Sequence, residues 1–184
     1  MRRTTRTLLA FAFALPLIAA TIADVNLENS VTVNGSPLVL NGGGIRKKLF
    51  IKIYVGGLYL PAKNNNATAI MGADTPRRMV MHFLYSVSKD QMCEAWNEGL
   101  EANTPHPTAE VSGSFKTLCS LMEAIPKGNR LVLTYVPGTG TTVEVNGKMK
   151  GTLPGKATAD AILSTWLGPN PAPGGDFKNG VLGK

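Results

Sequence analysis

The sequence predicts an α+β fold: an open-faced antiparallel β-sheet covered on one face by a layer of α-helices. Three observations support this prediction. Short apolar segments joined by glycine-containing turns occur in the first and the last third of the chain, which is typical of β-hairpins. Two segments with apolar residues at helical spacing lie between these hairpins, and a third follows the last one. The order strands, helices, strands, helix is the pattern of an α+β domain.

Residues 1–23 are predicted to be a secretory signal peptide. The first six residues include three arginines and no acidic residue, residues 8–23 carry no charge, and small residues precede Asp24. An uncleaved anchor is the alternative, but the apolar segment is short for a membrane span of roughly 20 residues, and Pro16 interrupts it. We therefore expect cleavage near Ala23 and export to the periplasm.

The remaining chain is long enough for one domain with a sizeable core. We place this domain at residues 24–172 and expect the proline- and glycine-rich tail, 173–184, to be loose. Without the signal, 16 basic residues (19 minus 3) face 12 acidic ones, a net charge of +4. This mild positive charge suits an anionic small molecule or a membrane surface. The lysines are spread along the chain, so we expect no nucleic-acid partner, and no later segment is apolar enough for membrane insertion.

The first predicted strands lie in residues 30–40, where two short apolar segments flank Asn34-Gly35. This dipeptide is typical of two-residue hairpin turns, because both positions require positive φ. A long strand is predicted over residues 49–60. Alternation along a strand places successive side chains on opposite faces. The two predicted faces are Ile51, Ile53 and Val55 on one side, and Phe50, Lys52 and Tyr54 on the other.

A third strand is predicted over residues 77–87 and is followed by two helices. Ser88 with Gln91 three residues later forms a capping box, which predicts a helix over residues 89–103. A second helix is predicted over residues 114–125, after a polar loop that contains two prolines.

Residues 130–153 predict three short strands, with turns at Pro137-Gly138 and Asn146-Gly147. A last helix is predicted over residues 156–167. Gly168 and the proline after it would stop this helix. Its inner side would consist of Ala161, Ile162, Thr165 and Trp166.

Metal and phosphate sites are not expected. His82 and His106 lie far apart and belong to no metal signature, so we expect structural or solvated roles for both. Residues 42–44 are three glycines, but no Lys-Ser or Lys-Thr pair follows at the spacing of a phosphate loop. We interpret these glycines as a tight turn or bulge. No cofactor is expected.

The two cysteines, Cys93 and Cys119, allow one disulfide bridge. An exported chain meets oxidising conditions, which would favour that bridge. The alternative is a pair of small buried thiols, because free cysteine packs as an apolar residue. The sequence leaves both possibilities open.

Three segments together resemble a known family. They read "NGGGIRKKLFIKIYVGGLYLP", "MHFLYSVSKDQMCEAWNEGLEANTP" and "VLTYVPGTGTTVEVNGKMKGTLPGKATADAILSTWLGPNP". In this order, over about residues 30–172, they resemble the chalcone isomerase-like proteins, in their exported bacterial branch. The resemblance implies an open antiparallel sheet, a helical layer and a cleft between the two.

The resemblance also implies candidate binding residues. Arg46 occupies the place of an arginine that faces the ligand in the plant enzymes of the family. Tyr54 stands where those enzymes have a threonine, and fatty-acid-binding members pair an arginine with a tyrosine around a carboxylate. Thr165 matches a hydroxyl-bearing residue near the end of the last helix.

The helix at residues 89–103 departs from the plant enzymes. They have a tyrosine near its start and an asparagine two turns later, where this chain has Met92 and Gly99, or Asn97 if the register shifts. No tyrosine occurs in this helix, so the phenol that would help to polarise the enone oxygen is missing. The resemblance therefore does not imply chalcone cyclisation.

Three functions remain open. We favour a non-catalytic binding protein for a fatty acid or similar anionic amphiphile, with Arg46 and Tyr54 on the carboxylate and Met92 in an apolar wall. An isomerase (an intramolecular lyase) acting on an unknown substrate is the second, with Arg46 stabilising an oxyanion. A structural or interaction protein with a closed cleft is the third, in which Arg46 would pair with an internal acid or backbone carbonyls.

Geometry adds one expectation to the binding hypothesis. In a straight strand, residues 46 and 54 would be roughly 26 Å apart, at 3.3 Å per residue. One carboxylate cannot contact both residues at that distance. We therefore predict that the chain turns back between Arg46 and Leu49, so that strand 36–43 pairs with strand 49–60.

Overall fold

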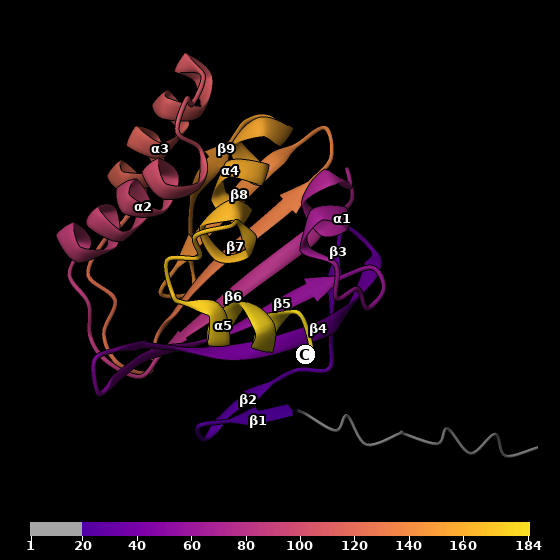
Figure 1. Ribbon diagram of the computed structural model, residues 1–184, viewed down its shortest axis with the longest axis vertical. Coiled ribbons are helices and arrows are strands. Elements are labelled where there is room, and N and C mark those ends of the chain that lie inside the picture. The colour runs from indigo at the N-terminus through magenta and orange to yellow at the C-terminus, as the bar shows by residue number, and fades with distance from the viewer. Residues whose placement is uncertain (1–19) are drawn as a thin grey trace, which may run out of the picture.

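The computed structural model describes residues 20–184, and its main element is a curled antiparallel sheet of seven strands in chain order (Figure 1). Each strand is joined to the next in the sequence, so the sheet is a continuous meander. The predicted fold class, an α+β protein with an open-faced antiparallel sheet, is confirmed. The strands are β3 (Ser30–Val33), β4 (Ser36–Lys48), β5 (Ile51–Leu60), β6 (Arg77–Phe83), β7 (Arg130–Val136), β8 (Gly140–Val145) and β9 (Lys148–Leu153).

Helices cover one face of this sheet (Figure 1). The helices α2, α3 and α4 contact one another over the later strands, and α5 lies over β4 and β5. None of the described helices is long and apolar enough to cross a membrane. The helices are α1 (Ala67–Gly72), α2 (Lys89–Asn103), α3 (Ala109–Leu121), α4 (Lys156–Leu167) and α5 (Gly175–Val181).

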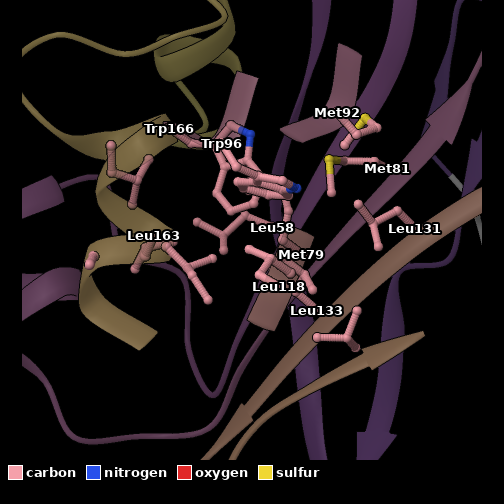
Figure 2. Packing of buried hydrophobic residues seen from close by; sticks show 14 of the residues in the cluster. Leu58, Met79, Met81, Met92, Trp96, Leu118, Leu131, Leu133, Leu163 and Trp166 are labelled. Atoms are coloured by element: carbon pink, nitrogen blue, oxygen red, sulfur yellow. The ribbon is translucent and has the colours of Figure 1, made fainter. Parts of the chain in front are cut away.

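The main core lies between the sheet and the helices. Figure 2 shows how side chains of β5, β6 and β7 meet those of α2, α3 and α4, with two indole rings at the centre. A smaller apolar cluster lies on the opposite face of the sheet, under a short hairpin of β1 (Ala20–Ile22) and β2 (Val25–Leu27). The main-core residues labelled in Figure 2 are Leu58, Met79, Met81, Met92, Trp96, Leu118, Leu131, Leu133, Leu163 and Trp166.

Several local predictions are confirmed. Both Asn-Gly turns have positive φ at each position, 47° and 76° at Asn34-Gly35 and 52° and 76° at Asn146-Gly147. The capping box is present as well: the Ser88 side chain accepts from the backbone of Gln91, and the Gln91 side chain accepts from the backbone of Ser88. Local turn and cap chemistry therefore fixes these element boundaries.

Three boundaries in the middle of the chain differ from the prediction. Helix α3 begins at Ala109, because the Thr108 side chain accepts a hydrogen bond from the backbone N–H of Val111 and so caps the helix there. Its predicted last turn is not helical, because Ile125 pairs with Val87 through backbone hydrogen bonds. The same pairing keeps Val87 outside β6 and brings the two connections together.

The three glycines at 42–44 do not form a tight turn, and the alternative interpretation, a bulge, is the one that fits the structure. They lie inside β4, next to a register shift between Leu40 and Gly42. A Cβ atom at Gly42 would lie 2.3 Å from the backbone oxygen of Gly180, and one at Gly44 would lie 2.7 Å from the backbone oxygen of Phe177. Glycine is needed here because α5 packs directly on the strand.

The C-terminal tail was predicted to be loose, and this prediction was also wrong. Within residues 173–184 it forms α5, and both Phe177 and Val181 are fully buried. The Asn41 side chain donates a hydrogen bond of 2.8 Å to the carbonyl of Val181. The prediction relied on the proline- and glycine-rich composition of the tail. It gave no weight to Phe177 and Val181, the apolar residues by which α5 packs against the glycines of β4. The folded unit therefore extends past residue 172.

The predicted signal peptide lies mostly outside the described residues, which begin at Ala20. Its last four residues, 20–23, include β1, which pairs with β2 and places Ile22 against the outer apolar cluster. Cleavage near Ala23 would remove β1 from the folded protein.

Candidate functional site

The hairpin of β4 and β5 brings the two main candidate residues together. Arg46 and Tyr54 are directly opposite each other as antiparallel partners. The predicted reversal of the chain is present, although it lies at Leu49 and Phe50, after the end of β4 at Lys48. Both side chains line the same cavity, so one small ligand can contact both.

A bulge in this hairpin changes the predicted faces of β5. The register shifts between Arg46 and Lys47, so Ile53 has no partner in β4. As a result Ile51 and Ile53 line the same cavity as Tyr54, where strict alternation would have placed them on opposite faces. Bulges of this kind redirect side chains and often occur beside binding sites.

The cavity has a volume of about 360 Å³ and lies between the end of the β4–β5 hairpin and helices α2 and α4. This volume is within the range of small-molecule sites, which are concave and mostly apolar. Its apolar wall consists of Leu49, Ile51, Ile53, Met81, Phe83, Val87, Met92, Ala95, Trp96, Trp166 and Ala172.

Tyr54 offers a hydroxyl donor to this cavity. The indole Nε1–H of Trp166 donates to the Tyr54 hydroxyl at 3.0 Å, so the hydroxyl oxygen already accepts one bond. Burial raises the pKa of Tyr54, and the nearby charge of Arg46 and the bond from Trp166 only partly oppose this. The phenol therefore stays protonated, and no acceptor for its hydrogen is found among residues 20–184. That hydrogen remains available to a ligand.

Arg46 supplies the positive charge of the site. Its side chain is half-buried at the cavity wall, and no carboxylate of the described chain lies within ion-pair distance of it. The acidic residues that line the cavity, Glu94 and Glu98, come from α2 and are exposed. A partly buried guanidinium without an acidic partner is suited to bind a carboxylate through two parallel hydrogen bonds.

Trp96 also lines the cavity and carries an N–H donor. Its ring packs edge to face against Trp166, with centroids 5.4 Å apart (Figure 2). The Trp96 Nε1–H is buried and has no hydrogen-bond partner in the described part of the chain. Leaving a buried donor unpaired is unfavourable. No feature of the sequence distinguishes this N–H from that of an ordinary core tryptophan.

The other three predicted binding residues have different positions. Met92 is buried in the cavity wall, as expected. Thr165 lines the cavity, but its hydroxyl donates to the carbonyl of Ile162 at 2.8 Å and can only accept from a ligand. Asn97 is exposed on the outer side of α2 and does not line the cavity, so its assignment to the site was wrong. Gly99 faces inward instead.

Gly99 also explains why an asparagine has no place at that point of α2. A Cβ atom at Gly99 would lie 2.8 Å from the Cγ2 atom of Thr165, so helices α2 and α4 approach too closely for a larger side chain. Where the resemblance implies a polar pair on this helix, the chain has Met92 and a close helix contact at Gly99.

Cys93 and Cys119 lie on the facing helices α2 and α3 as free thiols. The Sγ atom of Cys93 is 3.5 Å from the carbonyl oxygen of Cys119, and neither residue lines the cavity. Burial, followed by the neighbouring Cys93, raises the pKa of the Cys119 thiol to about 12. No metal-binding group of three or more ligands is found within residues 20–184.

A curled antiparallel sheet, a helical layer and a cavity between the two define a protein of the chalcone isomerase-like fold. The chain belongs to the chalcone isomerase-like family, whose sequence model matches residues 19–183. The resemblance inferred from the sequence is therefore confirmed at the level of the family.

Among solved structures, the fold is similar to that of a fatty-acid binding protein from Arabidopsis thaliana. The two share 18% sequence identity with a TM-score of 0.66, over 89% of this chain and 95% of the plant protein. At this identity the likeness concerns the fold. No curated protein sequence matches the chain.

Proposed function

We propose that this protein binds a fatty acid or a similar anionic amphiphile without chemical conversion. The observation that carries the proposal is the convergence of Arg46 and the Tyr54 hydroxyl on one apolar cavity. The carboxylate would accept hydrogen bonds from the guanidinium of Arg46 and from the phenol of Tyr54. The alkyl chain would lie against the apolar wall, where burial contributes roughly 0.8 kcal/mol per CH₂ group.

The likeness to a fatty-acid binding protein supports this proposal at the level of the fold. The cavity argues against the closed-cleft alternative, in which Arg46 would pair with an internal acid or with backbone carbonyls. Neither kind of partner is found for Arg46 within residues 20–184, and space remains beside it. Thr165 cannot serve as a hydroxyl donor in the isomerase alternative, because its hydroxyl already donates a hydrogen bond to the carbonyl of Ile162.

We also propose that the protein is exported and acts in the periplasm of a bacterium. The proposal rests on the arginine-rich start and on the uncharged stretch before Asp24. N-terminal sequencing of the secreted protein tests it and locates the cleavage site. Cleavage near Ala23 removes β1, whereas cleavage before Ala20 keeps the β1–β2 hairpin.

Native mass spectrometry of the purified protein, before and after delipidation, tests the binding proposal. We expect a co-purified fatty acid in the untreated protein and rebinding of added fatty acid after its removal. Arg46→Ala should lose both signals. Lys47→Ala is the matched control, because Lys47 is exposed, follows Arg46 directly and does not line the cavity. A wild-type protein that is free of lipid and fails to take up fatty acids would refute the proposal.

A further inference from the structure

The turn between β4 and β5 exposes large apolar side chains. Phe50 is 100% exposed and Leu49 is 88% exposed, while Ile51 and Tyr85 beside them are about half exposed. Tyr85 is held at this place because its backbone N–H donates to the carbonyl of Ile53. We call Leu49, Phe50, Ile51 and Tyr85 the apolar tip. The only other large hydrophobic side chain that is exposed on the described surface is Met149, on β9.

Turn geometry does not explain the apolar tip. The two Asn-Gly hairpin turns have an asparagine and a glycine where φ is positive, at Asn34-Gly35 and Asn146-Gly147. In the β4–β5 turn the residue with positive φ is Leu49, at 54°. This conformation is unfavourable for residues other than glycine, asparagine and aspartate. Folding alone would favour a polar residue here, and the place of Leu49 in the cavity wall still leaves 88% of the residue exposed.

The hairpin that carries the apolar tip is basic. The hairpin carries Arg46, Lys47, Lys48 and Lys52, and the last three are exposed. The sequence has no acidic residue between Glu28 and Asp74. The acidic side chains that line the cavity belong to α2 and not to the hairpin. Exposed apolar residues above a group of lysines are typical of segments that lie at the interface of an anionic membrane.

We propose that the apolar tip docks this protein on the surface of an anionic lipid bilayer. Leu49 and Phe50 would enter the headgroup region, and the lysines would lie at the lipid phosphates. Leu49, Ile51 and Tyr85 also line the cavity, so docking places the cavity mouth at the bilayer. The docking itself needs no ligand in the cavity. Transfer of a fatty acid between bilayer and cavity rests on the proposed function.

Vesicle co-sedimentation with Phe50→Ser tests the apolar part of the proposal. Phe50 is fully exposed and does not line the cavity, so its replacement should leave the fold and the ligand site intact. We expect wild type to bind vesicles of phosphatidylglycerol and phosphatidylcholine, and Phe50→Ser to bind at least tenfold more weakly. Met149→Ser, which removes an exposed apolar side chain elsewhere, should bind like wild type.

The double variant Lys47→Gln/Lys52→Gln tests the electrostatic part. Each lysine near an anionic surface contributes about fivefold to binding, so we expect a loss of about 25-fold. The control Lys63→Gln/Lys148→Gln removes the same charge from exposed positions outside the hairpin and should change little. Wild-type binding should also weaken as salt is added, because salt screens exposed charges.

Three outcomes would overturn the docking proposal. Wild type could fail to bind anionic vesicles, or it could bind vesicles of phosphatidylcholine alone just as well. A dimer in vesicle-free sedimentation that Phe50→Ser abolishes, without vesicle binding, would assign the apolar tip to self-association. Fatty-acid binding is measured in the absence of vesicles, so failure of docking and failure of the proposed function give separate results.

Discussion

Arg46 and Tyr54 face each other across the β4–β5 hairpin and line the same cavity. Eight positions separate them in the sequence, but the reversal at Leu49 and Phe50 makes them direct partners in the sheet. The pair combines a cation with a protonated phenol that has a free hydrogen. This combination matches a carboxylate, which only accepts hydrogen bonds when ionised.

The charge of Arg46 should make the site select acids over neutral amphiphiles. We expect wild type to bind a fatty acid at least tenfold more tightly than the alcohol of the same chain length, because a hydrogen bond to a charged group contributes about 1.5–3 kcal/mol. Arg46→Gln should lose this preference while still binding the alcohol. Displacement of a fluorescent lipid probe measures both affinities. Equal affinity of wild type for acid and alcohol would contradict the role of Arg46.

Replacing Arg46 by lysine tests the geometry of the contact. Lysine keeps the charge but presents a single point of donation, whereas arginine presents two parallel donors. Arg46→Lys should therefore bind the acid with an affinity between those of wild type and Arg46→Gln. Full recovery in the lysine variant would show that charge alone is sufficient.

Tyr54→Phe should affect both stability and binding. The variant leaves the Trp166 Nε1–H without its acceptor, which costs about 1–3 kcal/mol for a buried donor, and it removes one donor to the carboxylate. Urea unfolding measures the first effect, and the affinity for a fatty acid measures the second. We expect at least a tenfold loss of affinity.

A matched control is Tyr135→Phe. Tyr135 donates to Asp74 at 2.6 Å and does not line the cavity. Its replacement should destabilise the protein without changing fatty-acid affinity. If both tyrosine variants changed affinity equally, the effect of Tyr54 would be a general loss of stability.

Gly44→Ala should destabilise the protein by about 1–3 kcal/mol, the usual cost of overpacking a well-packed contact. The new methyl group would lie 2.7 Å from the backbone oxygen of Phe177 and would push α5 away from β4. Gly113→Ala is the control, since nothing lies within 4 Å of its Cβ position in the middle of α3. That control should stabilise the protein by about 0.5–1 kcal/mol. Urea unfolding distinguishes the opposite signs.

The cysteine pair should form a disulfide slowly. Bridging Cys93 and Cys119 would stabilise the protein by about 3 kcal/mol through loop closure. The Cys119 pKa of about 12, raised first by burial, leaves very little reactive thiolate at neutral pH. We expect the bridge to form more slowly in air near pH 7 than above pH 9 or with an added disulfide catalyst. Non-reducing intact mass follows the loss of two hydrogens, and Cys93→Ser provides the unreactive control.

The sequence predicted those parts of the fold that local chemistry determines. The Asn-Gly turns and the capping box of Ser88 and Gln91 act within a few residues, so they can be recognised without the tertiary structure. The reversal between Arg46 and Tyr54 was also predicted, although from a requirement of the ligand. Its position at Leu49 was missed because leucine is an unusual residue for positive φ.

Long-range contacts could not be predicted in the same way. The role of Gly42 depends on a backbone oxygen of Gly180, and nothing near either glycine in the sequence indicates that contact. Asn97 and Gly99 lie on opposite sides of α2, and which of them faces inward depends on how α2 is rotated against α4. The bulge at Ile53 depends on pairing between two strands, and strict alternation hides it.

The contact between Asn41 and Val181 joins residues that are 140 positions apart. Closing such a large loop has an entropic cost that grows with loop length, and distant pairings slow folding. The glycine face of β4 therefore stays uncovered until the last residues of the chain are available. A ribosome that has not yet released α5 therefore holds a chain whose sheet can be complete while β4 still lacks its cover.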